Sequence, residues 1–242
     1  MKRQGTIFVC CAAIMLISSC KKNTDKKASC RIVTVSQITS GSATTINITY
    51  NNDGKISTLN TSSSSGNTDK VFTYSGNTII INTTNGSSSS RDSVTVDGSG
   101  KPLNIRQFSD LTGTSWTNYS FEYNGADLLK FHQTSSSSAT PITNVATSSN
   151  GNMVGLQSPT SNTTLEYFTD KNVQPGDYLE LASSIQYGLS VYPHKNLVKT
   201  IDNGGGSITN FNYEFDADGN ITKVTSTGGG LATTLTYQYQ CN

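Results

Sequence analysis

The chain has few charged residues, few histidines and no long apolar run. Asp, Glu, Lys and Arg make up 14% of it, with a formal net charge of +1, whereas soluble domains average about 25%. No concentrated basic face is present, so the sequence gives no sign of a nucleic-acid partner. The two histidines, His132 and His194, are not spaced as zinc ligands, and no Cys-x-x-Cys motif occurs. We therefore expect no metal and no cofactor.

The apolar run near the start is too short to cross a bilayer. Ile7–Ile17 spans 11 residues, whereas a membrane helix needs about 20. Lys2 and Arg3 precede this run, and small residues stand directly before Cys20, as in a cleaved export signal. The segment resembles a bacterial lipoprotein signal with its lipobox.

This resemblance divides the chain into three parts and implies a location. Residues 1–19 would be a cleaved signal peptide, and Cys20 would become the lipidated first residue. Residues 20–29 would form a polar tether. Lys21 stands where an acidic residue would retain the protein in the inner membrane. We therefore expect a lipid anchor in the outer membrane, and whether the protein faces the periplasm or the exterior stays open.

Two cysteines are left in the mature chain, Cys30 and Cys241, near its two ends. The envelope is oxidising enough for disulfides. We predict a bridge that joins the first and last strands; the alternative is two separate thiols.

From Cys30 onward, apolar and polar residues alternate with the period of a β-strand. β-branched and aromatic residues dominate these runs, and Gly, Asn and Asp separate them. The predicted strands are 32–35, 45–50, 70–74, 78–81, 93–96, 120–123, 128–131, 211–215, 221–224 and 235–239.

The turns between strands repeat one scheme. In three segments a strand ends, an Asx-rich turn with Gly follows, and an aliphatic residue starts the next strand. These segments are Tyr50–Ile56, Val96–Leu103 and Phe215–Ile221. Recurrent hairpins predict an antiparallel meander. We therefore expect one all-β domain over residues 30–242, a curved sheet or partly open barrel with one short helix.

At these turns the chain resembles the YD-type (RHS-like) strand–turn repeats of bacterial wall-associated proteins. It resembles still more a Bacteroidota outer-membrane lipoprotein family of unknown function built from such hairpins. The literal Tyr-Asp pair is absent from the better copies, since residue 51 is Asn and Phe215 precedes Asp216. The resemblance implies a β-rich exported domain and no catalytic residues.

One stretch predicts a helix over 178–188. Asp177 is a suitable N-cap, Glu180 stands three residues later, and Gly188 suits the C-terminal cap. Its apolar stripe is expected to pack on one face or open end of the sheet, with a lid as the alternative reading. Homopolymeric stretches are read as loop tips: 62–65, 87–90, 135–138, 204–206 and 228–230.

Aromatic side chains are the main functional signal. Trp116, Tyr119 and Tyr123 lie close together in the sequence, and Tyr187 and Tyr192 flank the predicted helix. Such rings with neighbouring Asn and Thr suit ligand contact; the alternative is that they belong to the core.

Other candidate sites are fewer. Asp92-Ser93-Val94 resembles the short O-glycosylation sequence of Bacteroidota, which makes Ser93 a candidate acceptor. No catalytic constellation is found. Several carboxylates could contribute to a hydrolytic pair, but nothing in their spacing selects two of them. They are Glu122, Asp127, Glu166, Asp170, Glu180 and Glu214.

The sequence therefore predicts a non-enzymatic, membrane-anchored envelope lipoprotein that binds or scaffolds. Its partners are the membrane, through Cys20, and a glycan, a lipid or an envelope protein. The first alternative is a carrier or sensor of an apolar or glycan ligand in the concave face of the sheet. The second is a hydrolase. A roomy concavity would favour the carrier, a filled core the scaffold, and converging carboxylates the enzyme.

Overall fold

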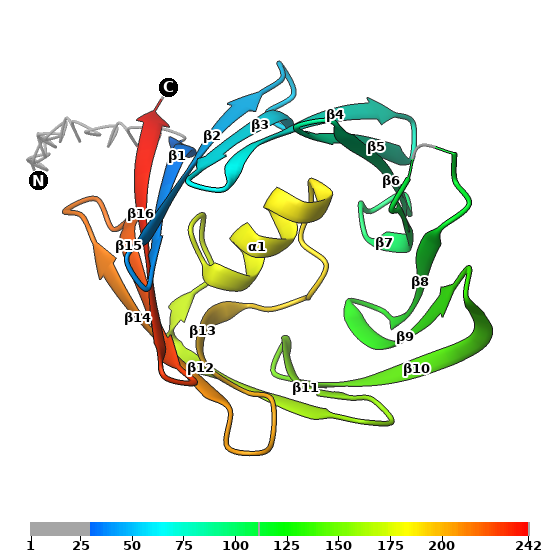
Figure 1. Ribbon diagram of the computed structural model, residues 1–242. Coiled ribbons are helices and arrows are strands. Elements are labelled where there is room, and N and C mark those ends of the chain that lie inside the picture. The colour runs from blue at the N-terminus through cyan, green and yellow to red at the C-terminus, as the bar shows by residue number, and fades with distance from the viewer. Residues whose placement is uncertain (1–29, 111, 242) are drawn as a thin grey trace, which may run out of the picture.

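The computed structural model describes residues 30–110 and 112–241. The predicted signal peptide and tether, with Cys20, lie outside the described residues. Sixteen antiparallel strands and one helix form a closed barrel (Figure 1). The elements in chain order are β1 (Cys30–Thr39), β2 (Ser42–Tyr50), β3 (Ile56–Ser63), β4 (Gly66–Ser75), β5 (Thr78–Asn85), β6 (Ser88–Val96), β7 (Pro102–Phe108), β8 (Trp116–Asn124), β9 (Asp127–Ser135), β10 (Ser138–Ser149), β11 (Asn152–Gln157), β12 (Asn162–Asn172), α1 (Tyr178–Tyr187), β13 (Asn196–Asp202), β14 (Ile208–Phe215), β15 (Ile221–Gly228) and β16 (Leu231–Cys241).

The barrel closes where the first strand meets the last. β1 pairs with β16 from Cys30 opposite Cys241 to Thr39 opposite Thr233. Closure pairs the backbone groups that an open sheet would leave unpaired at both edges. The all-β antiparallel meander with one short helix is confirmed, but the expectation of a curved sheet or partly open barrel is wrong. The structure places Cys30 and Cys241 in a disulfide across this seam, with the two sulfur atoms 2.05 Å apart.

The wall is apolar inside and polar outside. On β2, Ile46 and Ile48 are buried, while Asn47 and Thr49 between and beyond them are exposed. The same alternation on the other strands gathers Ile, Leu, Val and Phe into one interior core. Because successive side chains of a strand point to opposite faces, the polar residues that alternate with these apolar ones lie on the outer surface.

Helix α1 lies inside the ring of strands (Figure 1). A barrel of sixteen strands is too wide for its wall side chains alone to fill, and the helix occupies part of that space. Asp177 caps it by accepting from the amides of Leu179 and Glu180, and Gly188 ends it with a φ of 76°. The predicted helix and both caps are confirmed; its apolar side packs on the inner face of the wall, with Leu181 buried.

The two ends of the barrel differ in their turns. We call the end with Cys30 and Cys241 the disulfide end. The repeated turns lie there and are built alike: Asn51, Asp97 and Asp216 each accept two backbone amides through one side-chain oxygen, from residues two and four positions later. The predicted repeated hairpin turns are confirmed.

We call the opposite end the far end. Its turns contain the Ser and Gly runs, which were predicted to be loop tips. That expectation is only partly right, because Ser64 and Ser65 form a turn but Ser62 and Ser63 continue β3, and Ser88–Ser90 begin β6. Cross-strand hydrogen bonds hold these serines in strands despite their low strand preference.

Candidate functional site

One cavity lies at the far end, along β5 to β8. It has a volume of about 450 Å³. We call it the Asp92 cavity. Its lining combines hydroxyls, two amides, one carboxylate and two aromatic rings: Thr83, Asn85, Ser88, Ser89, Ser90, Asp92, Gln107, Phe108, Ser109, Ser115, Trp116 and Thr117. The inward positions of the wall are short and polar near this end, and they leave space that larger apolar side chains would fill.

Asp92 is the charged group of this cavity. Its residue is 9% exposed, and it accepts hydrogen bonds from the Gln107 amide and the Phe108 backbone amide. Burial raises the pKa of Asp92, although the Lys70 ammonium and these two donors act in the opposite direction. Burial likewise lowers the pKa of Lys70, against the attraction of Asp92. Each charge therefore partly offsets the cost of burying the other.

Lys70 also connects the wall to the helix. Its ammonium donates to the carbonyl of Ile185, 3.3 Å away, in the last turn of α1. Helix C-termini carry partial negative charge that a cation stabilises, and α1 has no basic residue of its own there. Lys70 thus couples the C-terminal end of α1 to the residue that carries the cavity's charge.

Trp116 and Phe108 border the cavity at the far ends of β8 and β7, and their rings share the outer face of the wall with Arg106. They face each other across β7 and β8. The Arg106 guanidinium lies over both rings, 4.4 Å from the Trp116 centroid and 5.2 Å from that of Phe108. Cation–π contacts of this kind are worth about 0.5–2 kcal/mol and fix ring orientation.

The five aromatic residues predicted as ligand contacts separate into three groups. Trp116 lines the Asp92 cavity. Tyr119, Tyr187 and Tyr192 gather inside the barrel, where Tyr187 is within electrostatic reach of the other two and of Asp92. Tyr123 lies at the disulfide end, with the Lys101 ammonium 5.6 Å above its ring. The structure therefore brings three of the five together, places Trp116 in the cavity and leaves Tyr123 apart.

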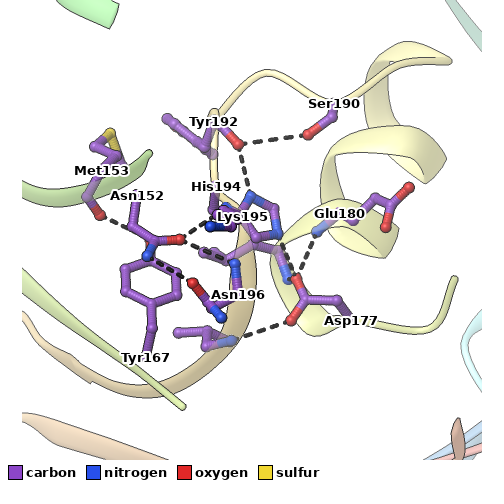
Figure 2. Close-up of polar contacts among 12 residues, drawn as sticks. Asn152, Met153, Tyr167, Asp177, Glu180, Ser190, Tyr192, His194, Lys195 and Asn196 are labelled. Carbon is purple, nitrogen blue, oxygen red and sulfur yellow. Dashed lines mark hydrogen bonds and ion pairs between the residues drawn. The ribbon is translucent and has the colours of Figure 1, made fainter. Parts of the chain in front are cut away.

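A buried network anchors the start of α1 (Figure 2). Asp177 is 0% exposed. One of its oxygens accepts from the helix amides and from His194 Nε2 at 2.8 Å. The other accepts from the Val198 backbone amide at 3.2 Å and from the Tyr213 hydroxyl at 3.1 Å. A single carboxylate thereby joins α1 to β13 and β14.

His194 is doubly protonated in this network. Its Nδ1 lies 2.7 Å from the carbonyl oxygen of Tyr192, and its Nε2 faces Asp177. Both partners are acceptors, so both ring nitrogens must donate. Burial alone would lower the pKa of His194, but the hydrogen bond and charge of Asp177 outweigh it and raise that pKa. Burial alone would raise the pKa of Asp177, but His194 and the backbone amides hold it below its ordinary range.

The segment after α1 is held by a pair of amides (Figure 2). Asn152, at the start of β11, accepts from the backbone amides of Lys195 and Asn196 at 2.7 and 3.0 Å. Its own amide donates to the Asn196 side chain at 3.1 Å. Both asparagines are buried, so the return from α1 to the wall is fixed by side chains rather than by strand pairing alone.

Two smaller cavities flank the helix. One, of about 340 Å³, lies at the disulfide end and includes Arg31, Lys55 and Glu180. Burial raises the pKa of Glu180. The other, of about 240 Å³, is bounded mainly by apolar side chains of α1 and of β1, β2 and β16. Both are smaller than the Asp92 cavity, and the second falls below the usual range of ligand pockets, about 300–1,000 Å³.

Three of the six carboxylates considered for hydrolysis form ion pairs on the outer wall. Glu122, Glu166 and Glu214 lie on the outer wall and pair with lysines of neighbouring strands at 3.2, 3.4 and 2.9 Å. Their side chains are 49%, 66% and 56% exposed. These are surface ion pairs, and nothing in their arrangement forms a cleft around a substrate bond.

The outer wall also carries a row of three polar side chains that resembles a nucleophile system. His132 Nδ1 lies 2.9 Å from the Thr143 hydroxyl, and its Nε2 lies 3.0 Å from Glu122. The row crosses β8, β9 and β10. None of the three lines the Asp92 cavity or the two cavities beside α1. Ser93, the candidate glycosylation site, also faces outward, in the middle of β6 between Asp92 and Val94, which point inward.

The two charged residues inside the barrel wall, Asp92 and Lys70, were not predicted as site residues from the sequence. Asp92 was noted only as the neighbour of Ser93, and Lys70 only as part of a strand. A signal was present, because each is a charged residue at the inward position of an alternating strand. The pairing of His194 with Asp177 had no signal in spacing, since 17 residues and the whole helix separate them.

No protein-family model matches this chain, and no curated protein matches it. Solved structures do match. A porin-like protein from Bacteroides uniformis superposes with a TM-score of 0.64 at 14% identity, covering 86% of this chain and 96% of the other. A porin-like protein from Bacteroides vulgatus superposes with a TM-score of 0.59 at 13% identity, covering 87% and 99%. The shared property is the fold. Among the residues that the structure describes, no helix is long and apolar enough to span a bilayer.

Proposed function

We propose that this protein is a lipid-anchored binding module of the bacterial envelope, a barrel held beside the membrane rather than inserted into it. The porin-like proteins from Bacteroides share its fold. The polarity of its wall supports a role different from that of a pore.

The observation that carries the proposal is the direction in which the apolar side chains point. A membrane-inserted barrel presents an apolar band about 25 Å tall to the lipid and keeps a polar lumen. Here Ile81, Ile105 and Leu128 are at most 1% exposed inside the wall. Exposed apolar residues lie among polar ones on this surface; Val71, for example, pairs with Thr58 on one side and Asn82 on the other. An outer surface of this kind is suited to contact with water rather than with lipid.

The position of Cys30 gives the barrel an orientation on its anchor. A lipid on Cys20 would leave residues 21–29 as the connection to Cys30, at the disulfide end. The disulfide end would then face the membrane, and the Asp92 cavity would open on the opposite side. A site at that end is accessible to soluble or cell-wall ligands.

The experiment separates anchoring by lipid from insertion of the wall. We expect the Cys20→Ser variant, expressed in a bacterium that processes lipoproteins, to lose incorporation of labelled fatty acid and to partition into the aqueous phase of a detergent extraction. The matched control is Cys11→Ser, which lies within the predicted signal peptide and should leave lipidation and detergent partition unchanged.

Two outcomes would contradict the proposal. One is a Cys20→Ser protein that still requires detergent, which would mean that the wall itself inserts. The other is stepwise conductance when the purified barrel is added to planar bilayers.

A further inference from the structure

We propose that the Asp92 cavity binds a neutral, hydroxyl-rich ligand, a sugar or the end of a glycan chain. This inference rests on the proposed binding role and names the ligand class of that role. It is carried by the chemistry of the cavity lining and by the balance of charge within it.

The lining can both donate and accept hydrogen bonds. Hydroxyl groups of Ser and Thr and the amides of Asn85 and Gln107 surround the space. Each of these groups has a donor and an acceptor. A ligand with hydroxyls around its periphery matches this lining, whereas a hydrocarbon would leave the polar groups without partners, at a cost for each.

The charge of the cavity points to a neutral ligand. Asp92 is the acidic residue in the lining, and the Lys70 ammonium acts on it from β4, two strands away. Because that charge is already partly offset, a ligand with a charge of its own would bring an unpaired charge into the site. The carboxylate of Asp92 still has lone pairs to accept from ligand hydroxyls, and such charge-assisted hydrogen bonds are the strong ones.

Trp116 and Phe108 border the cavity where β8 begins and β7 ends. Alternation along β7 and β8 directs their rings, with the Arg106 guanidinium over them, to the outer face of the wall. The indole therefore lies next to the site and can report on binding without contacting the ligand.

The size and position of the cavity agree with this ligand class. About 450 Å³ lies in the usual range for small-molecule sites, about 300–1,000 Å³. The cavity belongs to the end of the barrel away from Cys30, so an anchored protein would present it to soluble glycans.

Trp116 provides the test, because it is the single tryptophan of the chain. We expect its fluorescence to change saturably when the purified protein is titrated with a panel of neutral mono- and disaccharides, with at least one binding in the millimolar range or tighter. Asp92→Asn should weaken that binding by about tenfold or more. Calorimetry with the same sugars provides a readout independent of the indole.

The matched control makes the same chemical change on the outer wall. Asp69 on β4 is exposed and accepts a hydrogen bond from Asn60 at 2.8 Å, so Asp69→Asn should bind as the unmodified protein does. If Asp92→Asn fails to fold, Thr83→Val removes one lining hydroxyl while keeping the side-chain shape, and should weaken binding several-fold.

Three results would overturn the inference. They are no response to any neutral sugar by fluorescence and calorimetry, binding that neither Asp92→Asn nor Thr83→Val alters, and tighter binding of glucosamine or glucuronate than of the neutral sugars. A protein that partitions as proposed but binds no sugar refutes the ligand class alone, whereas conductance in bilayers refutes the proposed function.

Discussion

The two ends of this barrel are built from different chemistry. At the disulfide end, long side chains close the structure. Tyr50, Tyr74 and Tyr239 each donate a hydroxyl to the backbone carbonyl of an isoleucine 18 residues earlier, on the preceding strand. At the far end, serine, threonine and glycine replace these residues, and the space they leave is the Asp92 cavity. The comparison suggests that one end supplies stability and the other is free to bind.

The contrast extends to the cations and to the helix. Arg31 and Lys55 lie 5.4 and 5.0 Å over the rings of Tyr50 and Tyr74, and the disulfide end also holds the start of β1 and the end of β16. The Asp177 network fixes α1 to the wall there. Stability concentrated at one end allows the opposite end to be open, since binding sites are drawn from the less stable parts of a structure.

The strongest test of this contrast replaces Asp177. The Asp177→Ala variant leaves His194 protonated and buried without its partner, and the helix without its cap. Breaking such a buried pair costs about 3–5 kcal/mol, so we expect a loss of that order in the free energy of unfolding, measured by urea titration.

Asp110 at the far end is the matched comparison. The hydroxyls of Thr112 and Thr114, and then the amides of nearby loop residues, donate to it and lower its pKa, but it lies at the surface. Asp110→Ala should therefore destabilise less than Asp177→Ala. An equal or larger loss would show that the far-end loop is as important to stability as the disulfide end.

The disulfide should have the next largest effect. Cys30 and Cys241 are separated by 211 positions, and a bridge that closes a long loop restricts the unfolded chain strongly. We expect the double variant Cys30→Ala, Cys241→Ala to lose about 2–4 kcal/mol in urea titrations. Reducing agent should destabilise the unmodified protein by a similar amount and leave the double variant unchanged. Equal stability of the oxidised and reduced proteins would contradict this prediction.

Alanine substitutions at two glycines compare the side-chain packing at the two ends. Gly188 and Gly205 have φ values of 76° and 61°, so alanine is strained at either position. A Cβ at Gly188 would lie 3.0 Å from Phe72 Cδ1, whereas a Cβ at Gly205 would meet nothing within 4 Å. We expect Gly205→Ala to cost about 1 kcal/mol and Gly188→Ala about 1 kcal/mol more, by thermal unfolding. Equal losses would mean that both ends are packed alike.

The smallest expected effect is a dependence on pH. Folding raises the pKa of His194 above its ordinary 6.5, so its stabilisation is complete below about pH 6.5 and is lost as pH rises through the raised pKa. Folding lowers the pKa of Asp177, so its contribution is present above pH 3.8 and is lost as pH falls through the lowered value. Glu180 also faces His194 and supports its charge.

We therefore expect urea stability to decline as pH rises above 6.5, and to decline less steeply in His194→Gln, whose amide does not titrate. Parallel pH profiles of the two proteins would contradict the assignment of an imidazolium to His194.

Local features of this fold were predictable, and its closure was not. Caps, turns and the helix depend on a few neighbouring residues, so Asp177 and Gly188 could be recognised directly. Strands β10–β13 were missed because their alternation is weaker: Thr-rich stretches and Pro141 interrupt it. Closure depends on pairing between β1 and β16, about two hundred residues apart, and only Cys30 and Cys241 indicated it.

The candidate site was harder still, because it depends on which side of the wall each residue faces. Trp116 was identified from its aromatic neighbours, but Asp92 and Lys70 acquire their role from lying inward on adjacent parts of a closed wall. The face of a strand follows from its register, and a shift of one position would have placed both charges in solvent.

The seam between β1 and β16 has a consequence for how the molecule survives damage. The disulfide between the first and last strands closes residues 30–241 into a covalent ring. A protease that cuts any one turn at the far end would open the ring without releasing a fragment, and both new ends would stay paired in the wall. A nicked barrel of this kind would migrate as one molecule in electrophoresis until a reductant separated it into two.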